Sequence, residues 1–131
     1  MHPMVQQAVD ELKTSFPESI VESVDDGSGG AYVRVHALEF GSQYAPPTGW
    51  VTFHLKHTYP HEDVYPHHLP AGLVRANAQP LGEAFHLQDM QLGPFTGSTT
   101  TVSRRSNRWN PSQDSAALKL RKVLDWVRSR L

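Results

Sequence analysis

Apolar residues near the start of the chain recur at spacings of three and four, which is the pattern of one face of a helix. The stripe consists of Met4, Val5, Ala8, Val9, Leu12 and Phe16. Pro3 precedes it at a first-turn position where proline is tolerated, and Pro17 follows it where proline ends a helix. The pattern therefore predicts a helix over residues 4–16.

A period of two replaces this spacing further along the chain. Residues 31–40 and 50–57 each alternate apolar and polar side chains, and residues 19–24 form a shorter candidate that ends in a glycine-rich turn. The apolar faces consist of Val33, Val35 and Ala37 in one strand and Val51, Phe53 and Leu55 in the other. Three strands with short connections predict an antiparallel meander.

The middle of the chain, residues 58–107, shows little periodicity. Prolines and glycines are scattered through it, and only residues 72–76 suggest a further short strand. A long irregular stretch in a small domain is usually functional or disordered. Because its scattered Leu, Val and Phe indicate packing, we expect an irregular segment that carries the active site.

A second amphipathic helix is predicted over residues 112–131. Asn110, Pro111 and Ser112 supply a cap and an entry proline, and Lys119 and Lys122 are placed with the arginines on the surface. The expected buried seam consists of Ala117, Leu120, Val123, Leu124, Val127 and Leu131. Helices at both ends of an antiparallel meander predict one α+β domain over residues 1–131.

Composition narrows the classes of function. The 131 residues include no cysteine, which excludes disulfides, cysteine metal sites and a cysteine nucleophile in this chain. No apolar run is long enough to cross a membrane, and no leader-like segment opens the chain, so we expect a cytoplasmic protein with no membrane partner.

Charge is distributed unevenly along the chain. Residues 104–131 hold eight basic and two acidic residues, a net charge of +6, whereas the other four basic and eleven acidic residues give −7. This asymmetry favours charge-steered partners, although a solvated basic helix face would also account for it. A pI near 6.7 argues against nucleic acid as the partner.

Histidines are dense between residues 54 and 68, and clustered imidazoles can bind zinc or nickel. His54 and His57 would point to opposite faces of one strand, so the spacing does not form a ligand set. We expect loop and surface histidines and no metal or other cofactor, with a histidine-rich metal-binding domain as a distant alternative.

The segment at residues 97–111 is rich in hydroxyls and arginines and closes on an aromatic residue and a proline. It reads either as a polar loop before a helix or as hydroxyls in an electropositive loop beside a rigid anchor. Its hydroxyls include Thr101, Ser103 and Ser106, its arginines include Arg104 and Arg105, and Trp109 and Pro111 form the anchor.

The order of these elements resembles the ubiquitin-conjugating enzyme (E2) superfamily. Thr58-Tyr59-Pro60 follows the third strand and Trp109-Asn110-Pro111 precedes the last helix, as the Tyr-Pro and Trp-x-Pro motifs do in that family. Residues 103–114 read Ser-Arg-Arg-Ser-Asn-Arg-Trp-Asn-Pro-Ser-Gln-Asp, which is similar to the bacterial prokaryotic E2-like family E. The resemblance implies a UBC-like fold and a ubiquitin-like conjugation pathway, with an E1-like adenylating enzyme and a ubiquitin-like protein as partners.

The family's cysteine and its His-Pro-Asn turn are absent from the chain. Counting back from Trp109 to the family's cysteine position gives Thr101, with Ser103 close by. Three alternatives stay open: the protein carries acyl groups on a hydroxyl, it is a catalytically inactive binding module, or a cysteine has been substituted. We expect Ser103 as acceptor first, Thr101 second and Ser106 third.

A hydroxyl needs a base to become a nucleophile, whereas a thiol ionises readily. Residues 97–111 contain no His, Asp or Glu, and the nearest in sequence are His86, Asp89 and Asp114. The arginines cannot act as the base, and their expected role is to stabilise an oxyanion.

Overall fold

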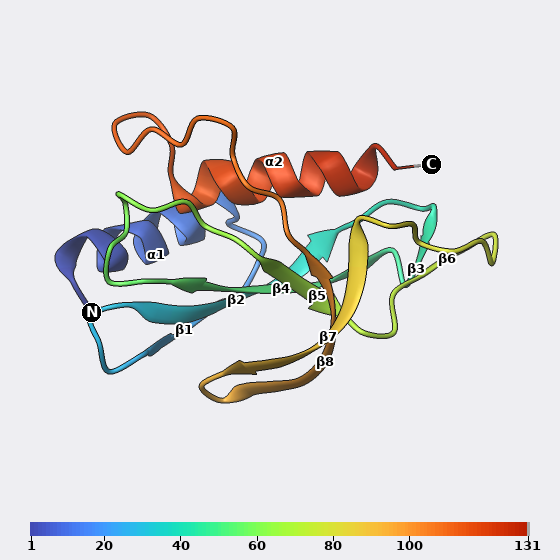
Figure 1. Cartoon of the computed structure of the whole chain (residues 1–131), viewed down its shortest axis with the longest axis horizontal. Helices are drawn as coiled ribbons and strands as arrows, with labels where there is room; N and C mark the ends of the chain where they lie inside the picture. The colour runs from blue at the N-terminus through green and yellow to red at the C-terminus, as the bar shows by residue number, and fades with distance from the viewer. Residues whose placement is uncertain (131) are drawn as a thin grey trace.

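The computed structural model describes residues 1–130. It has two helices on one face of a six-stranded antiparallel sheet, with a small two-stranded sheet beside it (Figure 1). The elements are α1 (Pro3–Ser15), β1 (Val21–Asp25), β2 (Ala31–Glu39), β3 (Tyr44–Ala45), β4 (Thr48–Leu55), β5 (His67–Pro70), β6 (Val74–Arg75), β7 (Phe85–Leu92), β8 (Phe95–Val102) and α2 (Ala116–Arg128). The predicted α+β class, with helices at both ends of an antiparallel sheet, is confirmed.

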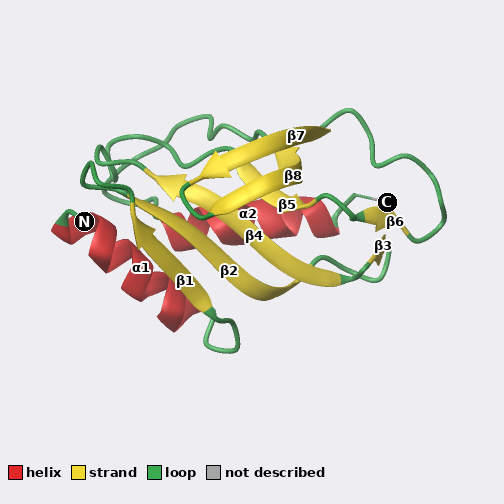
Figure 2. Ribbon diagram, turned by 90° about the horizontal axis from the view of Figure 1, so that it is seen from below, coloured by secondary structure: helices red, strands yellow, loops and turns green. Residues whose placement is uncertain are grey.

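The large sheet has the order β1-β2-β4-β5-β8-β7. Its first four strands form a meander, and every pairing is antiparallel. Figure 2 shows α1 and α2 side by side behind this sheet. β3 and β6 pair with each other, which gives the expected strand at residues 72–76 a partner outside the main sheet.

The core lies between the sheet and the two helices. The predicted stripes of α1 and α2 supply it from one side, except for Met4, which is exposed, and the alternating apolar residues of β2 and β4 supply it from the other. Its largest fully buried side chains are Tyr44, Phe40, Phe53, Leu12, Leu55, Leu69, Leu73, Leu120, Leu124 and His67. Burial of this apolar area is the main favourable term in folding.

The expectation of an irregular segment at residues 58–107 was wrong. This stretch contains β5 and the long hairpin of β7 and β8, whose strands pair from Phe85 and Val102 to Leu92 and Phe95. Gly93 and Pro94 form the two-residue turn, and Gly93 has φ 59°, which suits a hairpin turn that begins with glycine. The strands on either side of the turn carry mostly exposed polar residues, so no apolar alternation marks the hairpin in the sequence.

The hairpin curls beneath the sheet, on the face away from the helices (Figure 1). Near its turn, Phe95 packs against the guanidinium of Arg34, which lies 4.6 Å from the Phe95 ring and 3.8 Å from the Trp50 ring. The second face of the sheet is therefore partly covered by its own chain. Thr52 adds a hydrogen bond from Arg34 Nε at 2.7 Å.

Two details of the predicted helices and strands need correction. Ala37 has φ 57° at a register shift between Val35 and Leu38, so the burial alternation slips and Leu38 is buried in its place. α2 begins at Ala116 because Ser115 is the N-cap and its hydroxyl accepts a hydrogen bond from the Leu118 N–H at 3.2 Å. The expected seam residue Leu131 lies outside the described residues.

The prediction that Lys119 lies on the surface of the second helix was wrong. Lys119 is only 4% exposed, although it was assigned to the surface of the helix. It lies three residues after Ala116 and four before Val123, both buried, so its position falls on the seam of α2. A buried lysine needs a counter-charge, and this requirement locates the candidate site.

Candidate functional site

The loop between β8 and α2 borders a hollow of about 830 Å³. Its lining contains five basic side chains and one acidic side chain, together with polar residues and two tryptophans. We call it the cationic pocket; it is lined by Arg104, Arg105, Ser106, Asn107, Arg108, Trp109, Asn110, Pro111, Gln113, Asp114, Lys119, Lys122, Val123 and Trp126. Its volume lies within the range of small-molecule sites.

Ser106, Asp63 and Lys119 meet at the inner wall of this pocket. Lys119 Nζ donates to Ser106 Oγ at 2.7 Å and to the two Asp63 oxygens at 3.1 and 3.2 Å. The Ser106 hydroxyl donates to Asp63 Oδ1 at 3.1 Å, and the Ser106 N–H donates to Asp63 Oδ2 at 2.6 Å. The three residues come from the β4–β5 connection, the loop and α2, so the contacts join three segments distant in sequence.

The surroundings of this cluster shift the pKa values of its two ionisable groups. Burial by itself raises the pKa of Asp63, but the hydrogen bonds from the Ser106 N–H and Lys119 outweigh burial and lower it. Burial lowers the pKa of Lys119 and the pairing with Asp63 opposes that effect only in part. Asp63 is thus held as a carboxylate, with its negative charge directed at Ser106 and Lys119.

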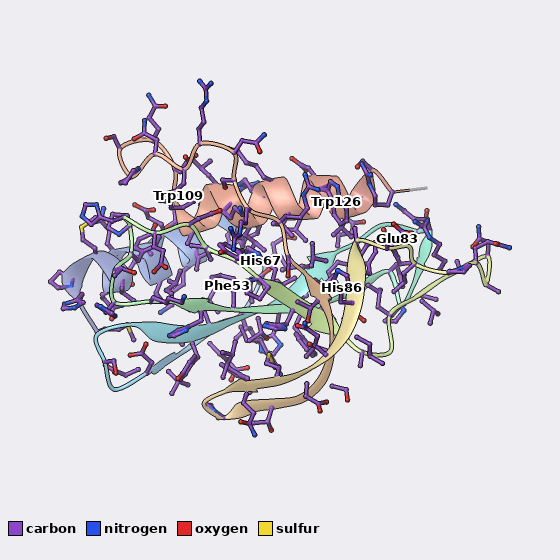
Figure 3. The ribbon with its side chains drawn as sticks, in the orientation of Figure 1. Phe53, His67, Glu83, His86, Trp109 and Trp126 are labelled. Carbon is purple, nitrogen blue, oxygen red and sulfur yellow. The ribbon has the colours of Figure 1, made fainter. Side chains whose placement is uncertain are left out.

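His67 lies between the sheet and α2, next to Phe53 (Figure 3). It is fully buried, and neither ring nitrogen has a hydrogen-bond partner among the described residues. Burial, followed by the positive charge of Lys119, lowers its pKa to about 3. The imidazole is therefore neutral at physiological pH and adds an unsatisfied polar group to the interior.

The Tyr-Pro and Trp-x-Pro motifs contact each other. The Trp109 Nε1–H donates to the carbonyl of Pro60 at 2.7 Å, and the hydroxyl of Tyr59 accepts from the Ala116 N–H at 3.0 Å. Asp114 accepts from the Asn110 N–H at 2.7 Å, which closes the turn around Pro111. These contacts fix the end of the loop to the start of α2.

The two predicted supporting arginines lie at the pocket and contact aromatic rings. The guanidinium of Arg104 lies 4.7 Å from the Trp126 ring, and that of Arg105 lies 4.9 Å from the Tyr65 ring. Stacking on a ring face leaves the N–H edges of a guanidinium free to bind an anion. Arg108 adds a third exposed guanidinium to the same wall.

The three candidate hydroxyls are not brought together. Thr101 is fully buried in β8, and its Oγ1 lies 3.0 Å from His68 Nδ1 and 3.2 Å from Thr99 Oγ1. His68 neighbours His67 on β5, so Thr101 points to the sheet face opposite the helices. Ser103 is exposed, and its hydroxyl has no partner within residues 1–130. Ser106 is half-buried and lines the cationic pocket.

Sequence reasoning missed Asp63, His67 and Lys119. Its candidate bases were the acidic and histidine residues nearest the loop, yet Asp89 accepts from Ser98 and Asp114 lies 3.6 Å from Lys122. The carboxylate beside the loop comes instead from residue 63, across the β4–β5 connection. The seam position of Lys119 was the one available signal.

The histidine tract is dispersed in the structure. His54 bonds to Asp26 at 2.7 Å, His68 contacts Thr99 and Thr101, and His67 is enclosed in the core. Among residues 1–130, no group of three His, Cys, Asp or Glu side chains is arranged to hold a metal ion. No helix in that part of the chain is long and apolar enough to cross a membrane.

Comparisons of the chain with protein-family models, curated proteins and solved structures gave no match.

Proposed function

We propose that the protein is an E2-like component of a bacterial ubiquitin-like conjugation pathway and that its cationic pocket binds the ubiquitin-like protein. The resemblance of its motifs supplies the pathway, and the E1-like enzyme is the second partner. The observation that supports the proposal best is the pocket itself, where the loop that holds the Ser-Arg and Trp-x-Pro motifs contributes three arginines and α2 contributes two lysines.

The placement of the motifs supports the same proposal. An antiparallel meander follows an amino-terminal helix, and the Tyr-Pro carbonyl holds the Trp109 side chain at 2.7 Å before the last helix. The β7–β8 hairpin has no counterpart in the layout on which the resemblance was drawn. Residue order and the contact between the motifs carry the E2-like assignment.

Charge complementarity makes the proposal testable. A partner with an acidic face would be steered to the pocket, so association should slow as salt shortens the Debye length from about 10 Å at 0.1 M to about 3 Å at 1 M. Association rates are to be measured with the ubiquitin-like and E1-like proteins encoded beside this gene. Absence of such genes, or binding that ignores salt, would contradict the proposal.

A matched pair of variants separates the pocket from overall charge. Arg108→Glu and Lys13→Glu make the same change in charge at exposed positions, but Arg108 lines the pocket and Lys13 lies on α1. Association should slow more in Arg108→Glu, because rim charges act mainly on the association rate. Equal slowing in both variants would indicate nonspecific attraction.

Binding alone would suit the inactive-module alternative, and carrier activity requires a reactive hydroxyl. Thr101 has a histidine beside it but is closed off from solvent, and Ser103 is exposed but has no base beside it. Ser106 has both a carboxylate within 3.1 Å and an opening into the cationic pocket. This observation favours carrier activity at Ser106 over the two hydroxyls ranked ahead of it.

A further inference from the structure

The Ser106 hydroxyl is hydrogen-bonded in the way expected of a serine that is to lose its proton. It donates to the carboxylate of Asp63 at 3.1 Å, and its oxygen accepts from the ammonium of Lys119 at 2.7 Å. A base within about 2.6–3.2 Å can take the proton of a nucleophile, and a nearby cation stabilises the negative oxygen that results. Ser106 therefore has a proton acceptor and a stabilising charge already in place.

We propose that Ser106 accepts an acyl group from an acyl phosphate, with Asp63 taking its proton. The inference rests on the proposed E2-like function, because it assigns the reactive atom and the class of donor in that pathway. Asp63 and Lys119 belong to the reacting set because both contact Ser106 directly. Ser106→Cys, which supplies a more readily ionised nucleophile at the same place, should be faster than the native serine.

The step balances without an oxidant or a further reagent. A bond forms between Ser106 Oγ and the acyl carbon, and the bond from that carbon to the phosphate oxygen breaks. The lowered pKa of Asp63 makes it a weak base, so the hydroxyl proton passes to it only as the bond to the acyl carbon forms. The phosphate leaves with the electron pair of the broken bond. An ester on Ser106 results, and an incoming amine would later displace the serine oxygen, which would then recover a proton.

The positive charge of the cationic pocket favours a phosphate leaving group. A phosphate leaving group is an anion, and Arg104, Arg105 and Arg108 present guanidinium groups on the wall beside Ser106. Guanidinium groups bind phosphate oxygens in paired hydrogen bonds. An uncharged ester offers the guanidinium groups no phosphate oxygens to bind, so the pocket fits acyl phosphates better than uncharged esters.

The interior beneath Ser106 supports a functional reading of the cluster over a purely structural one. His67 is fully buried with both ring nitrogens unpartnered among the described residues, and the charges of Lys119 and Asp63 act on it. Leaving a buried polar group unsatisfied costs about 1–3 kcal/mol. Several desolvated titratable groups next to a pocket are typical of a reactive site.

The test uses two small acyl donors and the full chain. Acetyl phosphate is an anion with phosphate oxygens, and p-nitrophenyl acetate is an uncharged ester. After incubation with each donor, peptide mass spectrometry locates acetyl groups, and hydroxylamine distinguishes serine esters, which it cleaves, from lysine amides, which it leaves. We expect an ester at Ser106. For each donor, the rate enhancement is the rate at Ser106 divided by the rate for a free-serine peptide, and this enhancement should be larger with acetyl phosphate than with p-nitrophenyl acetate.

Variants separate reactivity from structure. Ser106→Ala should remove the ester, and Asp63→Asn should slow its formation about a hundredfold, the usual contribution of a positioned base. Arg108→Ala should slow labelling by acetyl phosphate more than labelling by p-nitrophenyl acetate, a selective effect that loss of structure would not produce. Ser112→Ala, an exposed serine outside the pocket, is the matched control.

Each outcome bears on the proposal. Esters at Ser103 or Thr101, or only amides on lysines, would overturn the assignment of Ser106, and equal enhancement with both donors would overturn the acyl phosphate. Asp63→Asn also removes a charge next to Lys119, so Ser106→Cys gives a second measurement: its cysteine should react faster than a cysteine introduced at Ser112. Neither donor involves a protein partner, so failure here leaves the binding experiment of the proposed function standing.

Discussion

Thr101 and Ser106 lie five positions apart in sequence, yet they occupy opposite sides of the sheet. Both hydroxyls touch a titratable side chain, His68 in one case and Asp63 in the other. Thr101 is enclosed in a neutral polar cluster with Thr99, whereas Ser106 opens into the cationic pocket. A proton acceptor beside a hydroxyl is therefore insufficient for acyl transfer, because the acyl donor must also be able to reach the hydroxyl.

The largest effect should come from removing the counter-charge on the Ser106 side. Asp63→Ala leaves the Lys119 ammonium buried at 4% exposure without its partner, and breaking a buried ion pair in this way costs about 3–5 kcal/mol. The free energy of unfolding from urea titration measures it. Lys122→Ala removes a basic residue of the same helix whose 3.6 Å pair with Asp114 is exposed, and it should cost only about 0–1 kcal/mol.

A double variant sharpens this result. Asp63→Ala combined with Lys119→Met replaces both charges by apolar groups, so it should recover most of the lost stability. If the double variant were as unstable as Asp63→Ala alone, the loss would come from packing at residue 63 and not from an uncompensated charge.

Acid should destabilise the protein through His67 by a comparable amount. The folded pKa of about 3 lies below the ordinary value of 6.5, so the unfolded chain binds the proton first as pH falls. The penalty is absent above pH 6.5, grows as pH drops through the interval, and reaches roughly 4–5 kcal/mol near pH 3 at about 1.4 kcal/mol per pH unit.

The unfolding free energy measured against pH tests that assignment. His67→Leu removes the titrating ring and should flatten the profile between pH 6.5 and about 4, whatever its effect at neutral pH. Asp63 loses its contribution as pH falls through its own lowered pKa, which lies below the normal carboxyl range, so its loss comes at lower pH. A steep slope that survives in His67→Leu would contradict the role given to the imidazole.

Thr101→Val should have a smaller effect. It keeps the shape of the side chain and removes the 3.0 Å contact with His68, which retains Thr99 Oγ1 at 3.1 Å. We expect a loss of about 1 kcal/mol, the usual net value of one hydrogen bond, with no change in acylation. Reduced acylation in this variant at unchanged stability would break the contrast between the two sides of the sheet.

The smallest effect on stability is expected at the rim of the pocket. Arg108→Glu changes an exposed side chain with no hydrogen bond among the described residues. Its unfolding free energy should therefore stay within about 0.5 kcal/mol of that of the native chain. Its association with an acidic partner should nevertheless slow. A large drop in thermal melting temperature would indicate that Arg108 holds the loop together and does not serve recognition.

Sequence patterns predicted some elements of the fold and missed others. Helical spacing located both helices, and alternation with a period of two located the apolar faces of β2 and β4, because burial on one face forces each period. The β7–β8 hairpin was missed, since its strands carry exposed polar residues on a partly solvated edge and Gly93-Pro94 resembled a loop.

Sequence patterns likewise predicted some residues of the candidate site and missed others. Motif spacing found the loop with Ser106 and the arginines, because those residues are contiguous. Asp63 reaches the loop across 43 positions of sequence, and no local pattern records such a contact. Lys119 could have been found, because its position on the seam of α2 conflicts with its charge and implies a buried partner.

The most direct test of the account is the covalent adduct formed in the reconstituted pathway. The chain is incubated with ATP and the proposed partners, an E1-like enzyme and a ubiquitin-like protein encoded beside this gene, and the attachment site is mapped by mass spectrometry. The account predicts an ester at Ser106 that survives thiol reductant, is cleaved by hydroxylamine, is lost in Ser106→Ala and persists in Thr101→Val. An adduct at Thr101 or Ser103, or none while the partners still bind, would contradict it.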